Sequence, residues 1–216
     1  MQRLFYLLLV SAVIVFSGFT ATLDEVLAGT VRIETFSESG SLKGRGSGFL
    51  ISDQGLIVTN HHVMEGAASA IVHLSGGREF RQVIVEDFDE HKDLVLLRVE
   101  GIGLPTLSLG KSTESKTGDK IWVLGNTLGE YGNSVSQGVI SGVRHNDAGF
   151  KYLQFTAAIS PGNSGGPVLN ENYEVVGVAT ATRTDGQNVN FAIPVNYVLG
   201  MVENRRGLTL AQYREM

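Results

Sequence analysis

Residues 161–167 read Pro-Gly-Asn-Ser-Gly-Gly-Pro and place a single serine, Ser164, among three glycines and between two prolines. A serine hydroxyl becomes a nucleophile when a neighbouring base removes its proton. The carbonyl that it attacks then needs backbone N–H donors where its oxygen turns negative, and glycines allow the tight turn that aims such donors. Because surface turns use the same residue types, the segment predicts catalysis only if a base and an orienting acid occur elsewhere.

Candidates for both partners precede this serine in the chain. The candidate base lies in the segment 58–63, which contains two consecutive histidines, and the candidate acid is Asp93, directly before the apolar run 94–97. The sequence around Ser164 also fits the Gly-x-Ser-x-Gly turn of α/β-hydrolases, whose chain order is serine, acid, histidine. All five histidines precede Ser164, so an α/β-hydrolase would lack a base, and that fold is disfavoured.

The composition indicates a globular, glycine-rich protein. The 216 residues are 43% hydrophobic and 18% charged, with 27 glycines and a net charge of −5. This length suits one domain or two small lobes packed as one unit. The acidic balance and the lack of a Lys/Arg run argue against nucleic-acid binding. The absence of cysteine excludes disulfides, a cysteine nucleophile and a cysteine zinc site, and we expect neither a metal nor a cofactor.

Residues 1–21 predict a signal peptide or an N-terminal anchor. Arg3 supplies positive charge before an apolar run, 4–16, that only Ser11 interrupts. The uncharged stretch 4–23 has nearly the length that spans a bilayer, so cleavage and retention both stay open. We expect an exported protein, periplasmic in the first place and otherwise secreted or tethered to the inner membrane. It would touch a membrane only if this segment is retained.

Short alternating and apolar runs predict about six strands between residues 30 and 100 and about six between 120 and 193. We therefore predict an all-β fold of two six-stranded antiparallel β-barrels, with a single large sandwich as the alternative. Lobe 1 would cover about residues 28–103 and lobe 2 about 118–200, with a short C-terminal helix at about 195–214. The histidine pair and Asp93 then belong to lobe 1 and Ser164 to lobe 2, so the site would lie between the lobes.

Five stretches match one protease family in its own order, at residues 46–51, 55–63, 92–97, 157–167 and 190–196. Through them the chain resembles the chymotrypsin-fold serine proteases, and most closely the HtrA (Deg) branch of bacterial envelope proteases. The resemblance implies two perpendicular six-stranded barrels in a trypsin-like protease domain at residues 22–216. It assigns catalysis to His62, Asp93 and Ser164. His61 should then point to the neighbouring face, and Asp87 and Asp89 should be ordinary turn or surface acids.

The resemblance also implies the remaining site residues. The oxyanion hole would consist of the N–H groups of Gly162 and Ser164, with Asn163 between them. Ala158 would form the base of the pocket for the side chain before the cut, with Ile159 as a wall. Since neither is a carboxylate, we expect a preference for small or medium apolar residues. Substrate would pair with one strand, at Ala179, Thr180 and Ala181.

The expected function is that of a serine endopeptidase acting on unfolded or damaged envelope proteins. Its partners would be polypeptide substrates, and the family implies a homotrimer. HtrA proteins usually carry PDZ domains after the protease, whereas twenty residues follow Asn196 here, so we expect none in this chain. An inactive protease-fold binding or chaperone-like protein and a sandwich-type binding module remain the alternatives. The complete triad favours the enzyme.

Overall fold

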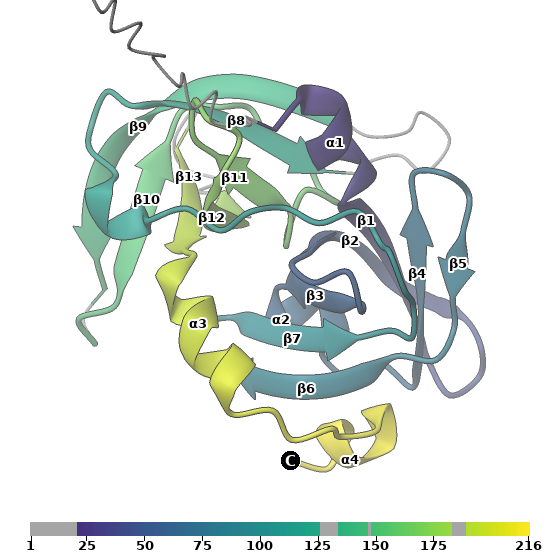
Figure 1. The fold of residues 1–216 in the computed structure, drawn as a ribbon. Helices are drawn as coiled ribbons and strands as arrows, with labels where there is room; N and C mark the ends of the chain where they lie inside the picture. Colours follow the sequence, from purple (N-terminus) through teal and green to yellow (C-terminus); the bar gives the residue numbers. More distant parts are fainter. Residues whose placement is uncertain (1–20, 126–133, 147, 183–188) are drawn as a thin grey trace, which may run out of the picture.

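A computed structural model of the chain describes residues 21–125, 134–146, 148–182 and 189–216. Apart from Ala21, the predicted signal peptide or anchor lies outside the described residues. In the described part of the chain, no helix has the length and the apolar character that a membrane crossing requires. The described residues form two antiparallel β lobes, and Figure 1 shows the strands β1–β7 in one lobe and β8–β13 in the other.

Lobe 1 is a seven-stranded antiparallel sheet in the order β5-β4-β1-β2-β3-β7-β6. Every residue of β3 is buried, because this strand has a core on each side. Ile57 lies in the core of lobe 1, whereas Leu56 and Val58 lie in a second core shared with lobe 2. The strands are β1 Thr30–Phe36, β2 Leu42–Leu50, β3 Leu56–Thr59, β4 Ser69–Leu74, β5 Glu79–Phe80, β6 Ile84–Asp89 and β7 Leu94–Arg98.

Lobe 2 is a closed barrel in the order β10-β13-β12-β11-β8-β9. Buried apolar side chains that include Ile121, Leu153 and Phe155 fill its interior. A 3₁₀ turn, Ser112–Glu114, lies in the connector between the lobes. The strands are β8 Lys120–Gly125, β9 Ser134–His145, β10 Lys151–Phe155, β11 Pro167–Leu169, β12 Val175–Thr182 and β13 Asn190–Pro194.

Four short α-helices accompany the strands in the described residues: α1 Leu23–Ala28, α2 His61–Met64, α3 Asn196–Glu203 and α4 Leu210–Arg214. The helix α2 directly follows β3. Val198 and Met201 of α3 enter the core that the two lobes share. In Figure 1 the chain continues from α3 along lobe 1 to α4, which lies beside β6.

The predicted all-β, two-lobe, chymotrypsin-like fold is confirmed. Lobe 2 is the expected six-stranded barrel. Lobe 1 differs in detail, since it gains the two-residue strand β5 and its sheet ends at β5 and β6. The C-terminal segment forms two helices where one was expected. The helix α3 ends at Glu203 with Asn204 as its C-cap. The chain then turns through Gly207, which has φ +68, before Thr209 caps the start of α4.

Candidate active site

His62 and Asp93 form a hydrogen-bonded pair at the edge of lobe 1. His62 lies on α2, and its Nδ1 is 2.8 Å from Asp93 Oδ2 and 3.0 Å from Oδ1. The backbone N–H of His62 donates to the same carboxylate at 2.9 Å. Asn60, which precedes α2, donates from Nδ2 to the backbone oxygen of Asp93 at 2.9 Å. Side-chain and backbone contacts therefore fix the imidazole against the acid.

The backbone of Asp93 has φ +53, a left-handed conformation that a β-carbon disfavours. Its N–H donates to Glu90 O at 3.1 Å, and Asp89 Oδ1 accepts from Lys92 N–H at 3.0 Å, so hydrogen bonds hold the turn before β7. Strained backbone of this kind persists where the surroundings fix it, and it is concentrated at functional sites. In this conformation the Asp93 carboxylate meets His62.

Asp93 is ionised at neutral pH. Burial raises the pKa of its carboxyl group, but hydrogen bonds from His62 and Thr180 outweigh burial and hold the pKa below its ordinary value. Thr180 Oγ1, on β12 of lobe 2, donates to Asp93 Oδ2. A carboxylate accepts hydrogen bonds only, so the His62 nitrogen that faces it carries a proton. In the neutral imidazole, Nε2 is then left as an acceptor.

Ser164 lies in the nucleophile loop, which we define as residues 156–166 between β10 and β11. Its backbone oxygen accepts from Ser47 N–H on β2 at 2.8 Å, which ties the loop to lobe 1. Its Oγ donates to Thr180 O at 3.3 Å. Within the described residues, Ser164 Oγ makes no hydrogen bond to His62. Such contacts often tighten only when substrate binds.

Two glycines of this loop occupy backbone positions that no other residue fits. Gly165 has φ +85, and a β-carbon there would lie 2.1 Å from Thr59 Oγ1 and 2.2 Å from Ser47 O. At Gly166 a β-carbon would lie 2.1 Å from Leu124 O. The loop is therefore pressed between both lobes, and this close approach requires glycine.

The turn that leads to Ser164 includes two N–H groups without an acceptor in the described part of the chain. Gly162 has φ +100, and Asn163 N–H donates to Ser160 O at 3.0 Å. Since proline holds φ near −65°, Pro161 followed by a positive φ defines a type II turn. Among the described residues, the N–H groups of Gly162 and Ser164 find no acceptor, whereas that of Asn163 does. The side chain of Asn163 is buried, and its Oδ1 accepts from Ser160 N–H at 3.3 Å. This side chain therefore stabilises the turn.

The turn is anchored through Gly162 O, which accepts from Ser47 Oγ at 2.6 Å. Ser47 in turn accepts from Thr59 Oγ1 through its backbone oxygen at 2.6 Å. Thr59 is the last residue of β3, two residues before α2 begins. One hydrogen-bonded path thus joins the strand that leads to His62 to the turn that precedes Ser164.

The predicted pocket residues lie close to Ser164 in the chain. Ala158 is exposed, and its backbone oxygen accepts from Ser136 Oγ at 2.6 Å. Ile159 is half-buried against the core of lobe 2. In β12, Ala179 O accepts from Gly165 N–H at 2.8 Å, so this strand runs directly beside the nucleophile loop. Ala181, the third predicted substrate contact, pairs with Phe191 in the ladder to β13.

A cavity of about 560 Å³ lies beside Asp93. Asp93 and Thr180 form one wall, and Tyr152 and Phe191 line it together with polar side chains from the β9–β10 hairpin. The cavity therefore adjoins the hydrogen-bonded pair and β12 at once. None of the predicted site residues except Asp93 and Thr180 lines this cavity.

The histidine and the two acids next to the candidate pair have different environments. His61 turns away from Asp93 and stacks on Phe88, with ring centroids 5.8 Å apart, in agreement with its predicted orientation. Asp89 caps the turn before Asp93, as an ordinary turn acid does. The expectation for Asp87 was wrong, because Asp87 is 8% exposed and pairs with Arg206 at 2.8 Å. A cation from a distant part of the chain permits this burial.

Sequence reasoning missed two side chains that organise the site. Thr180 was expected to contact substrate through its strand, and its hydroxyl also binds Asp93. Ser47 was only one member of a stretch that matched the family, and it holds both Gly162 and Ser164. The sequence around Thr180 and Ser47 does not indicate these contacts, because each contact joins distant positions. The separation is 87 residues from Thr180 to Asp93 and 115 from Ser47 to Gly162.

Curated proteins with similar sequences are serine proteases by name. Putative serine protease HhoA of Synechocystis is 40% identical over 164 residues, which are 72% of this chain and 41% of the relative. The probable periplasmic serine endoprotease DegP-like of Halomonas elongata is 38% identical over 167 residues, which are 74% of this chain and 35% of the relative. The chain thus spans about two fifths or less of these relatives' length.

Solved structures of serine proteases, an HtrA-type protease among them, share the fold. The HtrA-type protease AlgW with tripeptide superposes with a TM-score of 0.75 at 32% identity, covering 83% of this chain and 60% of that one. The serine endoprotease from Yersinia pestis gives 0.73 at 29% identity, with 83% and 63% covered. The Trypsin-like peptidase domain family matches residues 46–178, a span that contains His62, Asp93 and Ser164. The chain therefore belongs to the trypsin-like peptidase domain family, with HtrA-type proteases among its relatives.

Proposed function

We propose that the protein is a serine endopeptidase in which Ser164, His62 and Asp93 act as nucleophile, base and orienting acid. The observation that carries the proposal is the connected set of contacts at the lobe interface. Thr180 and His62 both donate to Asp93, and Ser164 Oγ lies within hydrogen-bonding distance of Thr180 O. Residues from 62 to 180 in the sequence thereby meet in one place with the chemistry of peptide hydrolysis.

In this mechanism Ser164 Oγ attacks the peptide carbonyl while His62 Nε2 takes its proton. His62 then gives that proton to the leaving amine, and a water molecule repeats the sequence to release the acyl group. Asp93 keeps the imidazole in the tautomer with Nδ1 protonated and stabilises its charged form. The pKa of Asp93, held below its ordinary value, keeps this acceptor ionised.

The N–H groups of Gly162 and Ser164 would stabilise the oxyanion. They are the two donors of the turn that lack acceptors among the described residues. A type II turn sets the direction of the peptide between Pro161 and Gly162, and the bond from Ser47 Oγ to Gly162 O holds it. Donors arranged before substrate arrives require no reorganisation during the reaction, which is the main source of their effect.

Substrate would bind as an extended strand along β12 at Ala179, Thr180 and Ala181. Ala158 and Ile159 would bound the pocket for the residue before the cut and favour small or medium apolar side chains such as Ala, Val or Leu. The cavity beside Thr180 would accept side chains further upstream in the substrate. A peptide library tests this, since predominant cleavage after Lys or Arg would contradict the pocket assignment.

Unfolded or damaged polypeptides of the cell envelope are the proposed substrates. The support is the apolar N-terminal segment of the sequence together with a relative named as periplasmic. Sequencing the N-terminus of the mature protein tests export and decides between a cleaved signal and an anchor. The mass of the purified protein in solution tests the homotrimer that the family implies.

Labelling with a fluorophosphonate probe, which reacts with activated serines, tests the enzymatic proposal. Wild-type protein should be labelled and should degrade denatured casein, and Ser164→Ala should lose both signals. Ser160→Ala is the matched control, because it removes the hydroxyl of another serine in the same loop and should leave both intact. A folded wild type that binds unfolded casein without labelling or cleavage would support the inactive binding protein instead.

A further inference from the structure

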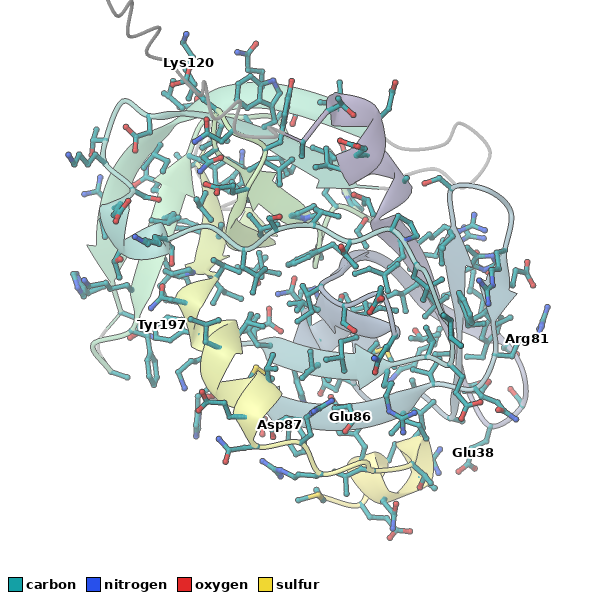
Figure 2. All side chains as sticks on the ribbon, in the orientation of Figure 1. Glu38, Arg81, Glu86, Asp87, Lys120 and Tyr197 are labelled. Carbon is teal, nitrogen blue, oxygen red and sulfur yellow. The ribbon has the colours of Figure 1, made fainter. Side chains whose placement is uncertain are left out.

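Residues 204–216 return to lobe 1 and pack against β6. Leu208 and Val85 exchange two backbone hydrogen bonds, at 2.8 and 2.9 Å. An ion pair joins Arg206 to the buried Asp87 at 2.8 Å. In Figure 2, Glu86 and Asp87 lie along β6 beside the stretch between α3 and α4. This segment therefore covers the edge of the sheet that contains β6 and β7.

The helix α4 is anchored on a second side of lobe 1. Arg214 pairs with Glu38, in the turn between β1 and β2, at 2.9 Å, and Figure 2 shows Glu38 on the side of lobe 1 nearest α4. Thr209 caps the helix through a reciprocal pair of bonds with Gln212. With its start capped and its end paired, this short helix has a defined position on the lobe.

Tyr213 of α4 belongs to an aromatic cluster, which we define as His61, Phe88 and Tyr213. Its ring meets Phe88 edge-on with centroids 4.9 Å apart and meets His61 edge-on at 5.6 Å. His61 also stacks on Phe88, so each ring contacts the other two. Such edge-to-face contacts prefer defined geometries, and the cluster therefore fixes the orientation of His61.

The aromatic cluster includes residues of the helix that carries His62 and of the hairpin that carries Asp93. His61 is the residue directly before His62 on α2. Phe88 is on β6 and pairs with Val95, two residues after Asp93. Tyr213 thus contacts the helix that carries the base and the hairpin that carries the acid. Its ring reaches this position from a segment 120 residues beyond Asp93 in the sequence.

The ring of Tyr213, rather than its hydroxyl, makes these contacts. Tyr213 is 5% exposed, and in the described part of the chain its Oη has no hydrogen-bond partner. Burial, together with the nearby carboxylates of Glu65, Asp93 and Glu90, raises the pKa of Tyr213, so the phenol stays neutral. Replacing an unpaired buried hydroxyl by hydrogen costs little or stabilises, which makes phenylalanine a conservative exchange here.

We infer that Tyr213 is a positioning residue, whose ring holds His61 against Phe88 and thereby sets the place of His62 relative to Ser164. The inference rests on the proposed function, because it concerns the base of that reaction. Tyr213 touches neither substrate nor reacting atoms. Its loss should lower the rate of the chemical step and leave substrate binding on β12 intact.

Steady-state kinetics on a peptide substrate tests the inference in the full-length protein. Tyr213→Ala should lower kcat roughly 10- to 100-fold, the scale on which a small misplacement of a catalytic group acts. KM should change by less than about threefold, since ground-state contacts remain. Tyr213→Phe should keep kcat within about twofold, because the ring is retained. His61→Ala should reproduce the loss, and combining it with Tyr213→Ala should add little to it.

Leu208→Ala separates positioning from stability. Leu208 packs on the same core from the same segment without belonging to the aromatic cluster. Both alanine variants should lower the melting temperature, and assays run well below it compare folded proteins. Only Tyr213→Ala should lose kcat. Equal kcat losses in the two variants, or a folded Tyr213→Ala protein with wild-type kcat, would overturn the inference.

A readout independent of activity distinguishes this inference from the proposed function. The proton on His62 Nδ1, bonded to Asp93, should give a low-field proton resonance that disappears in His62→Gln. Tyr213→Ala should weaken or shift that resonance, and Tyr213→Phe should preserve it. If the wild type is neither labelled nor active, the proposed function fails, and this resonance still decides whether Tyr213 positions His62. An unchanged resonance in Tyr213→Ala would contradict the inference.

Discussion

The nucleophile loop and the acid–base pair are held in place by different physical means. Backbone geometry fixes the loop, through glycines at positive φ and N–H bonds to Ala179 and from Ser47. Polar side-chain atoms contribute most to the pair, through the Asp93 carboxylate and the Thr180 hydroxyl, together with the backbone N–H of His62. One half of the candidate site thus depends mainly on the absence of a β-carbon, and the other half mainly on single polar atoms.

The two halves therefore tolerate different substitutions. In the loop, the conformation depends on the glycines whose β-carbons would clash and on the bond from Ser47 Oγ to Gly162 O. In the acid–base pair, an exchange that preserves volume can still abolish function, because it changes a charge or a donor. Substitutions confined to one half can test each of these dependences separately.

Asp93→Asn should have the largest effect on activity among the substitutions that keep Ser164. The exchange keeps the shape of the side chain, removes its charge and adds an amide donor, so His62 is no longer held in the tautomer with Nδ1 protonated. We expect kcat to fall about 10⁴-fold, the size of the same exchange in a serine-protease triad. Asp89→Asn is the matched control, since Asp89 interacts with Lys92 and not with His62. A loss of less than about tenfold in folded Asp93→Asn protein would refute the orienting role.

Gly165→Ala should disrupt the backbone-fixed half. The new β-carbon would meet Thr59 Oγ1 and Ser47 O at 2.1 and 2.2 Å, and φ +85 is strained for alanine. Strain and overpacking each cost about 1–3 kcal/mol, so we expect a loss of about 2–6 kcal/mol in the free energy of unfolding. Fluorophosphonate labelling should fall at the same time, because the loop must move to relieve the clash.

Gly40→Ala is the control for this comparison. Gly40 has φ +77, but no atom lies within 4 Å of the place that its β-carbon would take, so alanine there carries the strain without the clash. Urea denaturation should show a loss of about 1 kcal/mol there. Equal losses at the two glycines would mean that close approach contributes nothing at Gly165.

The parts of the molecule that follow local rules could be predicted from the sequence. Alternating and fully apolar runs predicted nearly all the strands, and the order of histidine, acid and serine separated this site from that of an α/β-hydrolase. The glycines around Ser164 predicted a tight turn, and Gly162 lies in one with φ +100. These features depend on neighbours within a few residues.

The contacts that the sequence could not predict join distant segments. Thr180 meets Asp93, Arg206 neutralises Asp87, and Tyr213 reaches His61, each through folding of the whole domain. No residue beside Asp87 in the sequence indicates that its partner lies more than a hundred positions away. Burial of a charge requires a partner, and for Asp87 only the tertiary structure supplies one. From the sequence we therefore expected Asp87 to be a turn or surface acid.

Thr180→Val should have a smaller effect than Asp93→Asn or Gly165→Ala, and it tests the contribution of the Thr180 hydroxyl through the pH dependence of stability. The pKa of Asp93 lies below its ordinary value, so its ionised form stabilises the fold above about pH 4, the unfolded value. That contribution is lost as the pH falls through the lowered folded pKa. Removing the Thr180 hydroxyl removes one donor and moves the folded pKa upward.

Urea denaturation of both proteins at pH 7 and at pH 3 measures the effect. At pH 7 the variant should be less stable by about 2 kcal/mol, the size of a hydrogen bond to a charged group. On acidification the wild type should lose more stability than the variant. The difference between their free energies of unfolding should therefore be smaller at pH 3 than at pH 7. Thr156→Val, at a hydroxyl that bonds to the backbone of Val139, should show a gap independent of pH. A constant gap for Thr180→Val as well would mean that its hydroxyl does not stabilise the Asp93 charge.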